Sequence, residues 1–215
     1  MGQLQTDIDE YNAAKKEKFP AEVLNTMAQA TQDLKSLGIE DRALAVGDKI
    51  PDFSLPNQKG EMRNIADLYS EATLVLNIYR GGWCPYCNFE MKALSGALPD
   101  IQAQGATLVG MAPETPDHAG DTVTRHEINI EVLSDAGNRV SEQLGLVFEL
   151  PEALRPMYQS AGIDIPAFNG DDSFRLPVPA TYIIGTDGIV KHAFVDADYT
   201  RRMEPEDILS VLKSL

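Results

Sequence analysis

The first 38 residues carry apolar side chains at the spacing of α-helices. A weak stripe comes first, and a stronger one follows at steps of three and four residues, which places its members on one helical face. The stronger stripe consists of Val23, Met27, Ala30, Leu34 and Leu37. This pattern predicts a helical N-terminal extension over residues 1–40. Core packing and a dimer contact both remain open for the stripe, and core packing is favoured because most amphipathic helices face a core.

From residue 46 onward the pattern changes to short apolar runs separated by turns. Residues 53–55 and 61–63 flank the turn Pro56-Asn-Gln-Lys-Gly60 and predict a β-hairpin. Further strands are expected at 73–79, 106–111, 131–133, 181–184 and 189–194. Helices are expected from the cysteine pair to about Leu94, with a continuation over 99–104, and at 138–144 and 205–215. The segment 146–178 is rich in Pro, Gly and Asp and reads as a long excursion. The core order β-α-β-α-β-β-α predicts one α/β domain over residues 45–215.

The cysteines of the chain, Cys84 and Cys87, lie two residues apart in the stretch Cys-Pro-Tyr-Cys. They follow the apolar run 73–79 and the turn Arg80-Gly-Gly-Trp83, so they stand where a strand leads into a helix. The first turn of a helix offers free backbone N–H groups and a partial positive charge of about half an electron. Both features favour a thiolate over a thiol, so the pattern indicates thiol–disulfide chemistry.

A metal site, a permanent disulfide and two inert thiols are weaker interpretations of the pair. A zinc site usually needs four ligands, and His118, His126 and His192 have no metal-ligand spacing, so neither a metal nor another cofactor is expected. A permanent disulfide across two residues constrains the unfolded chain little and therefore adds little stability. Two inert, buried cysteines are the remaining alternative, because free cysteine is often buried.

Composition limits the partners. The formal net charge is −15, which disfavours binding to nucleic acid or to anionic membranes. No targeting segment is recognisable at the start of the sequence, and no apolar run approaches the roughly 20 residues of a membrane span. A cytoplasmic location is therefore expected, and there a closely spaced cysteine pair is more often redox-active than structural.

The element order, with the cysteine pair after the first core strand, resembles the thioredoxin fold. This resemblance implies a central mixed sheet flanked by helices. In that fold a cis-proline faces the cysteine pair. The resemblance implies that this residue is Pro179, in Val178-Pro-Ala-Thr181, and Pro177 is the alternative candidate. From Val46 to Phe194 the chain also resembles the AhpC/TSA family, the peroxiredoxins and peroxiredoxin-like proteins. Its stretch from Gly47 to Leu55 is similar to the opening of that family.

The peroxiredoxin motif, aligned without gaps, implies that Cys87 is the peroxidatic cysteine and that Glu90 is the glutamate commonly found three residues later. Cys84 then stands at the threonine position of the motif and Arg80 at its proline position. The usual active-site arginine would fall on Pro179. Arg80 is a candidate for the missing cation, with a solvated arginine as the alternative, and Glu90 is either a site residue or a surface charge.

The resemblance implies a thiol-dependent peroxidase that reduces hydrogen peroxide or organic hydroperoxides through a sulfenic acid and a Cys84–Cys87 disulfide. Thioredoxin or a similar thiol donor, or a glutathione-type reductant, would recycle the enzyme. Register favours Cys87 as the attacking sulfur, whereas exposure at the helix start favours Cys84, and both assignments remain open. The segment Asp198-Tyr-Thr-Arg-Arg202 approaches the site, caps the final helix or ties down the C-terminus, and these alternatives remain open.

Two further functions remain as alternatives. Trp83 before the pair is similar to thioredoxin and Cys-Pro-Tyr-Cys to glutaredoxin, which implies a thiol–disulfide oxidoreductase in which Cys84 attacks and Cys87 resolves. A non-catalytic redox sensor or binding module would instead use the aromatic residues of segment 146–178 as a partner surface. Core or loop anchoring is the simpler role for those aromatics. A homodimer is compatible with the sequence.

Overall fold

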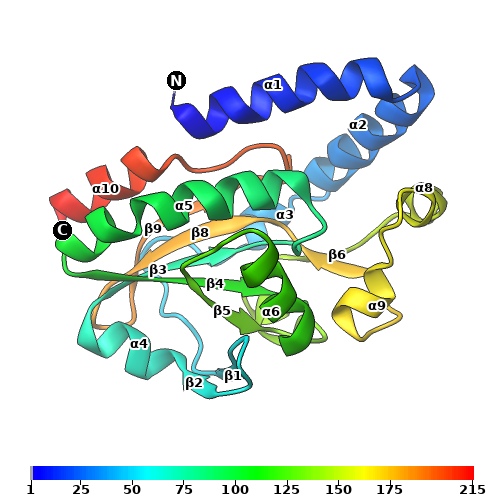
Figure 1. Cartoon of the computed structure of the whole chain (residues 1–215). Helices are drawn as coiled ribbons and strands as arrows, with labels where there is room; N and C mark the ends of the chain where they lie inside the picture. Colours follow the sequence, from blue (N-terminus) through cyan, green and yellow to red (C-terminus); the bar gives the residue numbers. More distant parts are fainter. Residues whose placement is uncertain (1) are drawn as a thin grey trace.

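The computed structural model describes residues 2–215 and places a five-stranded mixed sheet at its centre (Figure 1). The strand order is β5-β4-β3-β8-β9. Strands β3, β4 and β5 run parallel, β8 pairs antiparallel with β3, and β9 pairs antiparallel with β8. The five sheet strands are β3 (Thr73–Ile78), β4 (Ala106–Ala112), β5 (Glu131–Ser134), β8 (Ala180–Ile184) and β9 (Val190–Val195). The predicted mixed α/β architecture is confirmed.

Helices cover both faces of this sheet. The larger are α1 (Gln3–Lys18), α2 (Ala21–Ser36), α4 (Ile65–Glu71), α5 (Pro85–Ala103), α6 (Pro116–Arg125) and α10 (Pro205–Ser214). Shorter ones are α3 (Ile39–Arg42), α7 (Arg139–Gln143), the 3-10 helix η1 (Glu152–Leu154), α8 (Arg155–Ser160) and α9 (Ile165–Asn169). One core cluster joins α1, α5 and α10 to the sheet, and a second joins α3, α4 and α7 to its other face. Both clusters are almost wholly aliphatic or aromatic, as expected for a sheet buried on both sides.

Two small antiparallel pairs lie outside the central sheet. The predicted hairpin is confirmed as β1 (Ser54–Pro56) and β2 (Met62–Asn64). Inside the segment expected to be an excursion, β6 (Val147–Glu149) pairs with β7 (Arg175–Pro177) and encloses η1, α8 and α9. The aromatic residues of this segment serve as anchors: Tyr158 is buried, and the Phe168 ring contacts His118 at a centroid distance of 4.9 Å.

Some helices differ from the sequence expectation. The expected break before Pro99 is absent, because α5 continues unbroken to Ala103. A proline costs the helix one hydrogen bond, but Leu94 and Ile101, on either side of it, are fully buried and hold both halves against the sheet. Helix α6 does not follow from the apolar pattern of the sequence. Thr115 caps its start through its side chain and Pro116 occupies its first turn, which is a recognisable local signal.

The apolar stripe of α2 is partly exposed and contacts the core only at its edges. None of its residues is buried, although Met27, Ala30 and Leu34 contact the edges of core clusters. Leu37 is 69% exposed. The favoured expectation of core packing is therefore only partly met, because the stripe faces a cavity.

Candidate active site

The cysteine pair sits at the junction of β3 and α5. Cys84 is the N-cap residue of α5, in an extended conformation, and Pro85 opens the helix. Cys87 lies in the first helical turn, and both thiols are free, with Cys84 2% and Cys87 0% exposed. A proline at the first position costs no hydrogen bond there and its fixed φ suits a helix, so the sequence itself sets the helix start between the two sulfurs.

The loop before the pair is held by a buried carboxylate. Gly81 adopts a φ of +138°, a region that favours glycine, and its carbonyl accepts a hydrogen bond from the backbone N–H of Cys84 at 3.1 Å. The backbone N–H of Gly82 donates to Oε1 of Glu114 at 2.9 Å, and the Thr122 hydroxyl donates to the same oxygen at 3.2 Å. Burial raises the pKa of Glu114 to about 7, although these donors oppose the shift. No sequence pattern marks Glu114, because its role depends on a contact between two loops.

A second buried carboxylate, in an ion pair, lies beside Cys87. Nη2 of Arg202 donates to Cys87 Sγ at 3.5 Å, and the backbone N–H of Arg80 donates to the same sulfur at 3.5 Å. Nε of Arg202 lies 2.6 Å from Oε2 of Glu90, and both side chains are 2% exposed. Burial raises the pKa of Glu90 to about 7, although the positive charge of Arg202 acts against this shift. Glu90 is therefore buried beside the cysteine pair, so the alternative of a surface charge is wrong, and a role in the reaction stays a prediction.

Arg80 occupies an aromatic enclosure on the other side of the pair. Its side chain is buried, so the alternative of a solvated arginine is wrong. Nη2 donates to the Tyr158 hydroxyl at 2.9 Å, and the guanidinium carbon lies 5.1 Å from the Trp83 ring centroid and 4.9 Å from that of Tyr199. Contact with aromatic faces stabilises a desolvated guanidinium by about 2 kcal/mol. Trp83 and Tyr158 also contact each other edge to face at 5.7 Å.

The pKa values of the two thiols are shifted in opposite directions. The pKa of Cys84 is lowered to about 6, first by the hydrogen bond from Cys87 and then by the charges of Arg80 and Arg202, although burial opposes the shift. The pKa of Cys87 is raised well above its ordinary value, mainly by burial and by its hydrogen bond to Cys84. The directions of the two shifts favour a negative charge on Cys84 over one on Cys87.

Cys84 also has access to a cavity of about 190 Å³, here called the cysteine cavity. Cys87 is not part of its lining. The walls combine the first helix, the cysteine loop and the excursion, and include Tyr11, Lys15, Arg80, Trp83, Cys84, Tyr86, Tyr158 and Tyr199. The pair is thus asymmetric, with one sulfur facing a cavity and the other enclosed.

Helix α1 docks on this site through hydrogen bonds and ring contacts. The Tyr86 hydroxyl donates to Oδ1 of Asn12 at 2.6 Å, and Lys15 Nζ donates to the Tyr199 hydroxyl at 3.3 Å. The Tyr11 and Tyr86 rings meet edge to face at 5.3 Å. Tyr86, between the two cysteines in sequence, therefore helps to hold α1 over the start of α5, together with the buried Leu4 and Ile8 of α1.

Pro179 does not take the expected form. Every peptide bond among residues 2–215 is trans, so the cis-proline prediction is wrong. The trans isomer of an X–Pro bond is intrinsically favoured by about 0.5–1 kcal/mol. Here the backbone N–H of Val178 donates to the Leu146 carbonyl at 2.8 Å, which continues the β6–β7 pairing up to Pro179. Pro179 lines a second cavity together with Arg80 and Tyr199, and Cys84 is not among the residues of that cavity.

The segment after β9 brings an arginine, Arg202, to the cysteine pair, whereas the usual arginine position is occupied by Pro179. Of the alternatives open for residues 198–202, the structure shows that this segment reaches the site through Tyr199 and Arg202, and the N-cap of α10 is Glu204. Nη1 of Arg202 donates to the backbone carbonyls of Tyr199 and, at 2.7 Å, Arg201. These bonds lock the guanidinium in place, and such locking lowers the entropy lost when the arginine acts on a sulfur.

Two further observations concern the described residues 2–215. Within them, no group of three or more His, Cys, Asp or Glu side chains is arranged to hold a metal ion. No helix in that range is long and apolar enough to cross a membrane.

Comparisons with known proteins show which family and which fold this chain resembles. A sequence profile of the AhpC/TSA family matches residues 46–193. Peroxiredoxin Bcp of Escherichia coli (strain K12) is 26% identical over 156 residues, which cover 71% of this chain and 86% of that protein. The thiol-disulfide oxidoreductase ResA of Geobacillus thermodenitrificans is 27% identical over 177 residues, covering 82% of this chain and 81% of ResA. The crystal structure of the peroxidoxin BcpB from Mycobacterium tuberculosis superposes with a TM-score of 0.63 at 21% identity, covering 80% of this chain and 98% of BcpB.

Proposed function

Because the chain belongs to the AhpC/TSA family, we propose that it is a thiol-dependent peroxidase whose attacking sulfur is Cys84. The observation that carries this proposal is the asymmetry of the pair: Cys84 has the lowered pKa and faces the cysteine cavity, whereas Cys87 is enclosed. The proposal reverses the roles that alignment to the peroxiredoxin motif favours, since the motif places the peroxidatic cysteine at Cys87. Reactive cysteines are those with a lowered pKa and access to substrate.

The reaction has three steps. The Cys84 thiolate attacks the terminal oxygen of a hydroperoxide, the O–O bond breaks, and the leaving alkoxide or hydroxide takes a proton from water. The resulting sulfenic acid at Cys84 condenses with the Cys87 thiol, whose proton leaves with the hydroxyl group as water, and a Cys84–Cys87 disulfide forms. A dithiol or two small thiols then reduce this disulfide by exchange.

The charges around the pair suit the first step. Arg80 is buried and lines the cysteine cavity, so its positive charge lies close to Cys84. A preorganised donor in a water-poor site stabilises the negative charge that develops on the leaving oxygen, and such donors are typically worth about 100-fold in rate. Arg202 and the backbone N–H of Arg80 position Cys87 for the second step.

The reductant is a thioredoxin-like protein or a glutathione-type thiol. Cys84 is 2% exposed beneath α1, so a small thiol reaches it through the cysteine cavity, whereas a protein reductant requires α1 or the 196–204 segment to move. Parallel recycling assays with glutathione and with a thioredoxin system distinguish the two.

The burial of Cys84 disfavours large protein disulfides as substrates, although the likeness to ResA keeps thiol–disulfide exchange as the second candidate function. Insulin reduction tests it directly.

Trapping of the sulfenic acid tests the assignment of the two sulfurs. We expect Cys87→Ser, treated with one equivalent of hydrogen peroxide, to accumulate a sulfenic acid at Cys84 that a dimedone reagent captures. Cys84→Ser should give no adduct above that of the denatured protein. An adduct at Cys87 instead would restore the motif-based roles, and peroxide loss no faster than with free cysteine would remove the peroxidase function altogether.

A further inference from the structure

Helix α1 carries a lysine into the wall of the cysteine cavity. Lys15 lines this cavity together with Cys84. Its Nζ donates to the Tyr199 hydroxyl at 3.3 Å and to the Tyr86 hydroxyl at 3.5 Å. The same nitrogen lies 5.7 Å and 5.6 Å from the centroids of these two rings. One ammonium group is therefore held between the stretch that contains both cysteines and the segment between β9 and α10.

Lys15 has no carboxylate partner. None of the ion pairs among residues 2–215 includes this lysine, and no Asp or Glu belongs to the lining of the cysteine cavity. Of the lining groups that can become negative, Tyr11, Tyr86 and Tyr199 have raised pKa values. The pKa of Cys84, by contrast, is lowered to about 6. The Cys84 thiolate is therefore the anion that Lys15 faces inside this cavity.

The charges around Lys15 act on it in both directions. Burial lowers the pKa of this lysine and the charge of Arg80 acts in the same direction, whereas negative charges on Cys84 and Asp198 raise it. If Cys84 loses its charge, a half-buried ammonium remains next to a buried guanidinium, with Asp198 as the compensating group. A desolvated charge is costly unless an opposite charge compensates it, so this loss weakens the attachment of Lys15.

The second half of α1 depends on these polar contacts. The buried residues of α1, Leu4 and Ile8, both lie in its first half. In the second half, Oδ1 of Asn12 accepts a hydrogen bond from the Tyr86 hydroxyl at 2.6 Å, and Lys15 makes the contacts described above. The end of α1 that covers the cysteine cavity is thus the end with the less buried apolar surface.

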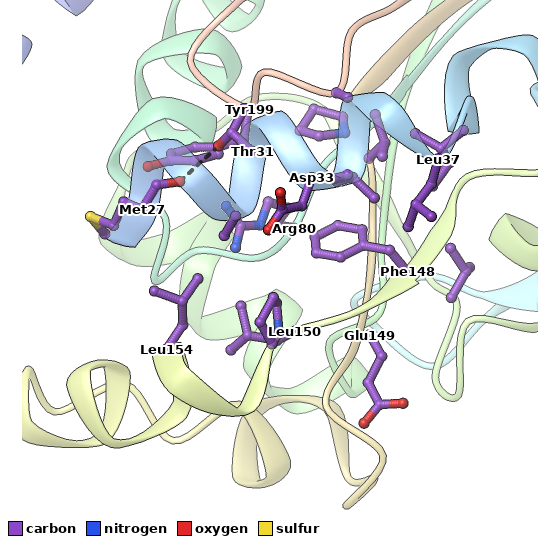
Figure 2. A pocket seen from close by; sticks show the side chains of 18 of the residues that line it. Met27, Thr31, Asp33, Leu37, Arg80, Phe148, Glu149, Leu150, Leu154 and Tyr199 are labelled. Atoms are coloured by element: carbon purple, nitrogen blue, oxygen red, sulfur yellow. Dashed lines mark hydrogen bonds between the residues drawn. The ribbon is translucent and has the colours of Figure 1, made fainter. Parts of the chain in front are cut away.

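Helix α2 adds little to the docking of α1. It follows α1 after Phe19 and Pro20, and none of its residues is buried. Figure 2 shows α2 above a cavity of about 360 Å³, with Leu150 and Leu154 on the opposite side. Because α2 lies over a cavity and contacts the core only at its edges, it does not hold the second half of α1 in place.

We propose that Lys15 is a positioning residue of the cysteine pair, which couples the docking of α1 to the negative charge on Cys84. The thiolate holds the ammonium and with it the second half of α1, and the docked ammonium in turn favours the thiolate. Such reciprocity is required of any two coupled equilibria. Helix α1 and Tyr199 lie outside residues 46–193, so the coupling uses parts of the chain that the family profile does not match.

The coupling makes α1 a lid that responds to the redox state of the pair. This consequence rests on the proposed function, in which the Cys84 sulfenic acid condenses with the Cys87 thiol and releases water. The sulfur of Cys84 is then neutral, Lys15 loses the anion that it faces, and the second half of α1 lifts more readily. The disulfide becomes accessible to the thiol that reduces it, and α1 closes again over the regenerated thiolate.

Lys15 is one of several groups that act on Cys84. The hydrogen bond from Cys87 and the charges of Arg80 and Arg202 are the main causes of the lowered pKa of Cys84. Two unit charges about 6 Å apart in a water-like medium shift a pKa by about half a unit. We therefore expect an effect of this size from Lys15.

Three substitutions on α1 test the charge of Lys15. Lys15→Met removes the ammonium and Lys15→Arg keeps a cation. Lys16→Met is the control, because Lys16 is exposed and lines neither cavity. The pH midpoint of Cys84 alkylation by iodoacetamide should rise by about half a unit in Lys15→Met and stay near the wild-type value in the other two variants. An unchanged midpoint in Lys15→Met, or an equal rise in Lys16→Met, would overturn the proposal.

Hydrogen exchange of the α1 amides measures the reciprocal effect. In reduced protein at pH 8, the amides of residues 11–18 should exchange about threefold faster in Cys84→Ser than in the wild type, the factor that corresponds to half a pKa unit. In a Lys15→Met background, Cys84→Ser should make no such difference. Equal exchange in the wild type and Cys84→Ser, or the same acceleration without Lys15, would refute the coupling.

Oxidation by diamide separates this inference from the proposed function. Diamide takes two hydrogen atoms from the dithiol and forms the disulfide without peroxide, and exchange in residues 11–18 should then quicken about threefold. If exchange responds but the wild-type protein consumes no peroxide, the peroxidase function fails and the coupling stands. If peroxide is consumed but exchange responds neither to diamide nor to Cys84→Ser, the coupling fails and the peroxidase function stands.

Discussion

Nη2 of Arg202 lies 3.5 Å from Sγ of Cys87, although 115 residues separate them in the chain. The same guanidinium forms the buried ion pair with Glu90, one helical turn beyond Cys87 on α5. The sulfur, the carboxylate and the guanidinium thus form one buried unit. The guanidinium belongs to Arg202, which lies in the segment between β9 and α10. The position just before β8 is occupied by Pro179.

Removal of Arg202 should separate its structural from its chemical role. Arg202→Met leaves Glu90 buried without its counter-charge, and we expect a loss of about 3 kcal/mol in the free energy of unfolding. Arg202→Met combined with Glu90→Gln removes both charges and should recover most of this loss. Peroxide reduction should nevertheless stay about 10- to 100-fold below wild type in the double variant, because the donor to the cysteine pair is still missing. Chemical denaturation and steady-state kinetics measure the two quantities. Full recovery of the rate would show that Arg202 acts only on stability.

The thiolate at Cys84 should be visible in alkylation kinetics. The pKa of Cys84 is lowered to about 6, so the rate of reaction with iodoacetamide should rise with pH and reach half of its plateau near pH 6. Cys87→Ala removes the hydrogen bond that is the largest cause of this shift, and the midpoint should move up by at least one pH unit. In Cys84→Ser, Cys87 should stay unreactive through neutral pH because burial raises its pKa. A midpoint at the ordinary thiol value in the wild-type protein would contradict the electrostatic description of the site.

Glu114 should make the stability depend on pH in a direction opposite to that of a normal surface carboxylate. Its folded-state pKa is raised to about 7 by burial, so between the unfolded value and pH 7 the folded state binds the extra proton. Its contribution to the free energy of unfolding is therefore full at low pH and falls as pH rises from about 4.5 to above 7. The loss is at most about 3 kcal/mol. Glu114→Gln does not titrate, so urea denaturation across this range should show a flatter profile. Parallel profiles for both proteins would refute the assignment.

The cysteine loop should reject a side chain at Gly81. An added Cβ would lie 2.5 Å from Nε1 of Trp83, and the φ of +138° disfavours any L side chain. Gly81→Ala should therefore destabilise the protein by about 2 kcal/mol and lower its activity, because the loop must shift. Gly96→Ala is the control: Gly96 lies on the exposed side of α5, where an added methyl group would have no atom within 4 Å, and alanine should stabilise the helix by up to about 1 kcal/mol. Equal effects of the two substitutions on thermal unfolding would contradict the strain argument.

Local signals explain which elements the sequence predicts well. The strands from 73, 106 and 180 are mainly apolar runs bounded by turn residues, whereas the strand from 190 has Lys191 and His192 between its apolar residues, and all four lie in the central sheet. The cysteine helix is fixed by Pro85 at its first position. By contrast, β6 and β7 lie in a segment with an irregular pattern, because each is only three residues long and is stabilised by a partner at the far end of that segment.

The sequence by itself determined the chemistry of this protein: two sulfurs two residues apart, at the start of a helix that follows a buried strand. This is local information, because helix starts and apolar runs are read from neighbouring residues. Only the tertiary structure decided which sulfur holds the charge and which faces a cavity. The pKa of Cys84 depends on its hydrogen bond with Cys87, on burial and on the charges of Arg80 and Arg202, and its access depends on Tyr158, Tyr199 and Met27 of α2, which line the cysteine cavity. The apolar stripe of α2 is compatible with a core, a partner or a cavity until the fold places it. The hydrogen bond from Cys87 and the charge of Arg80 are local, but burial and the position of Arg202 are set by the fold, and no local pattern encodes either of these two.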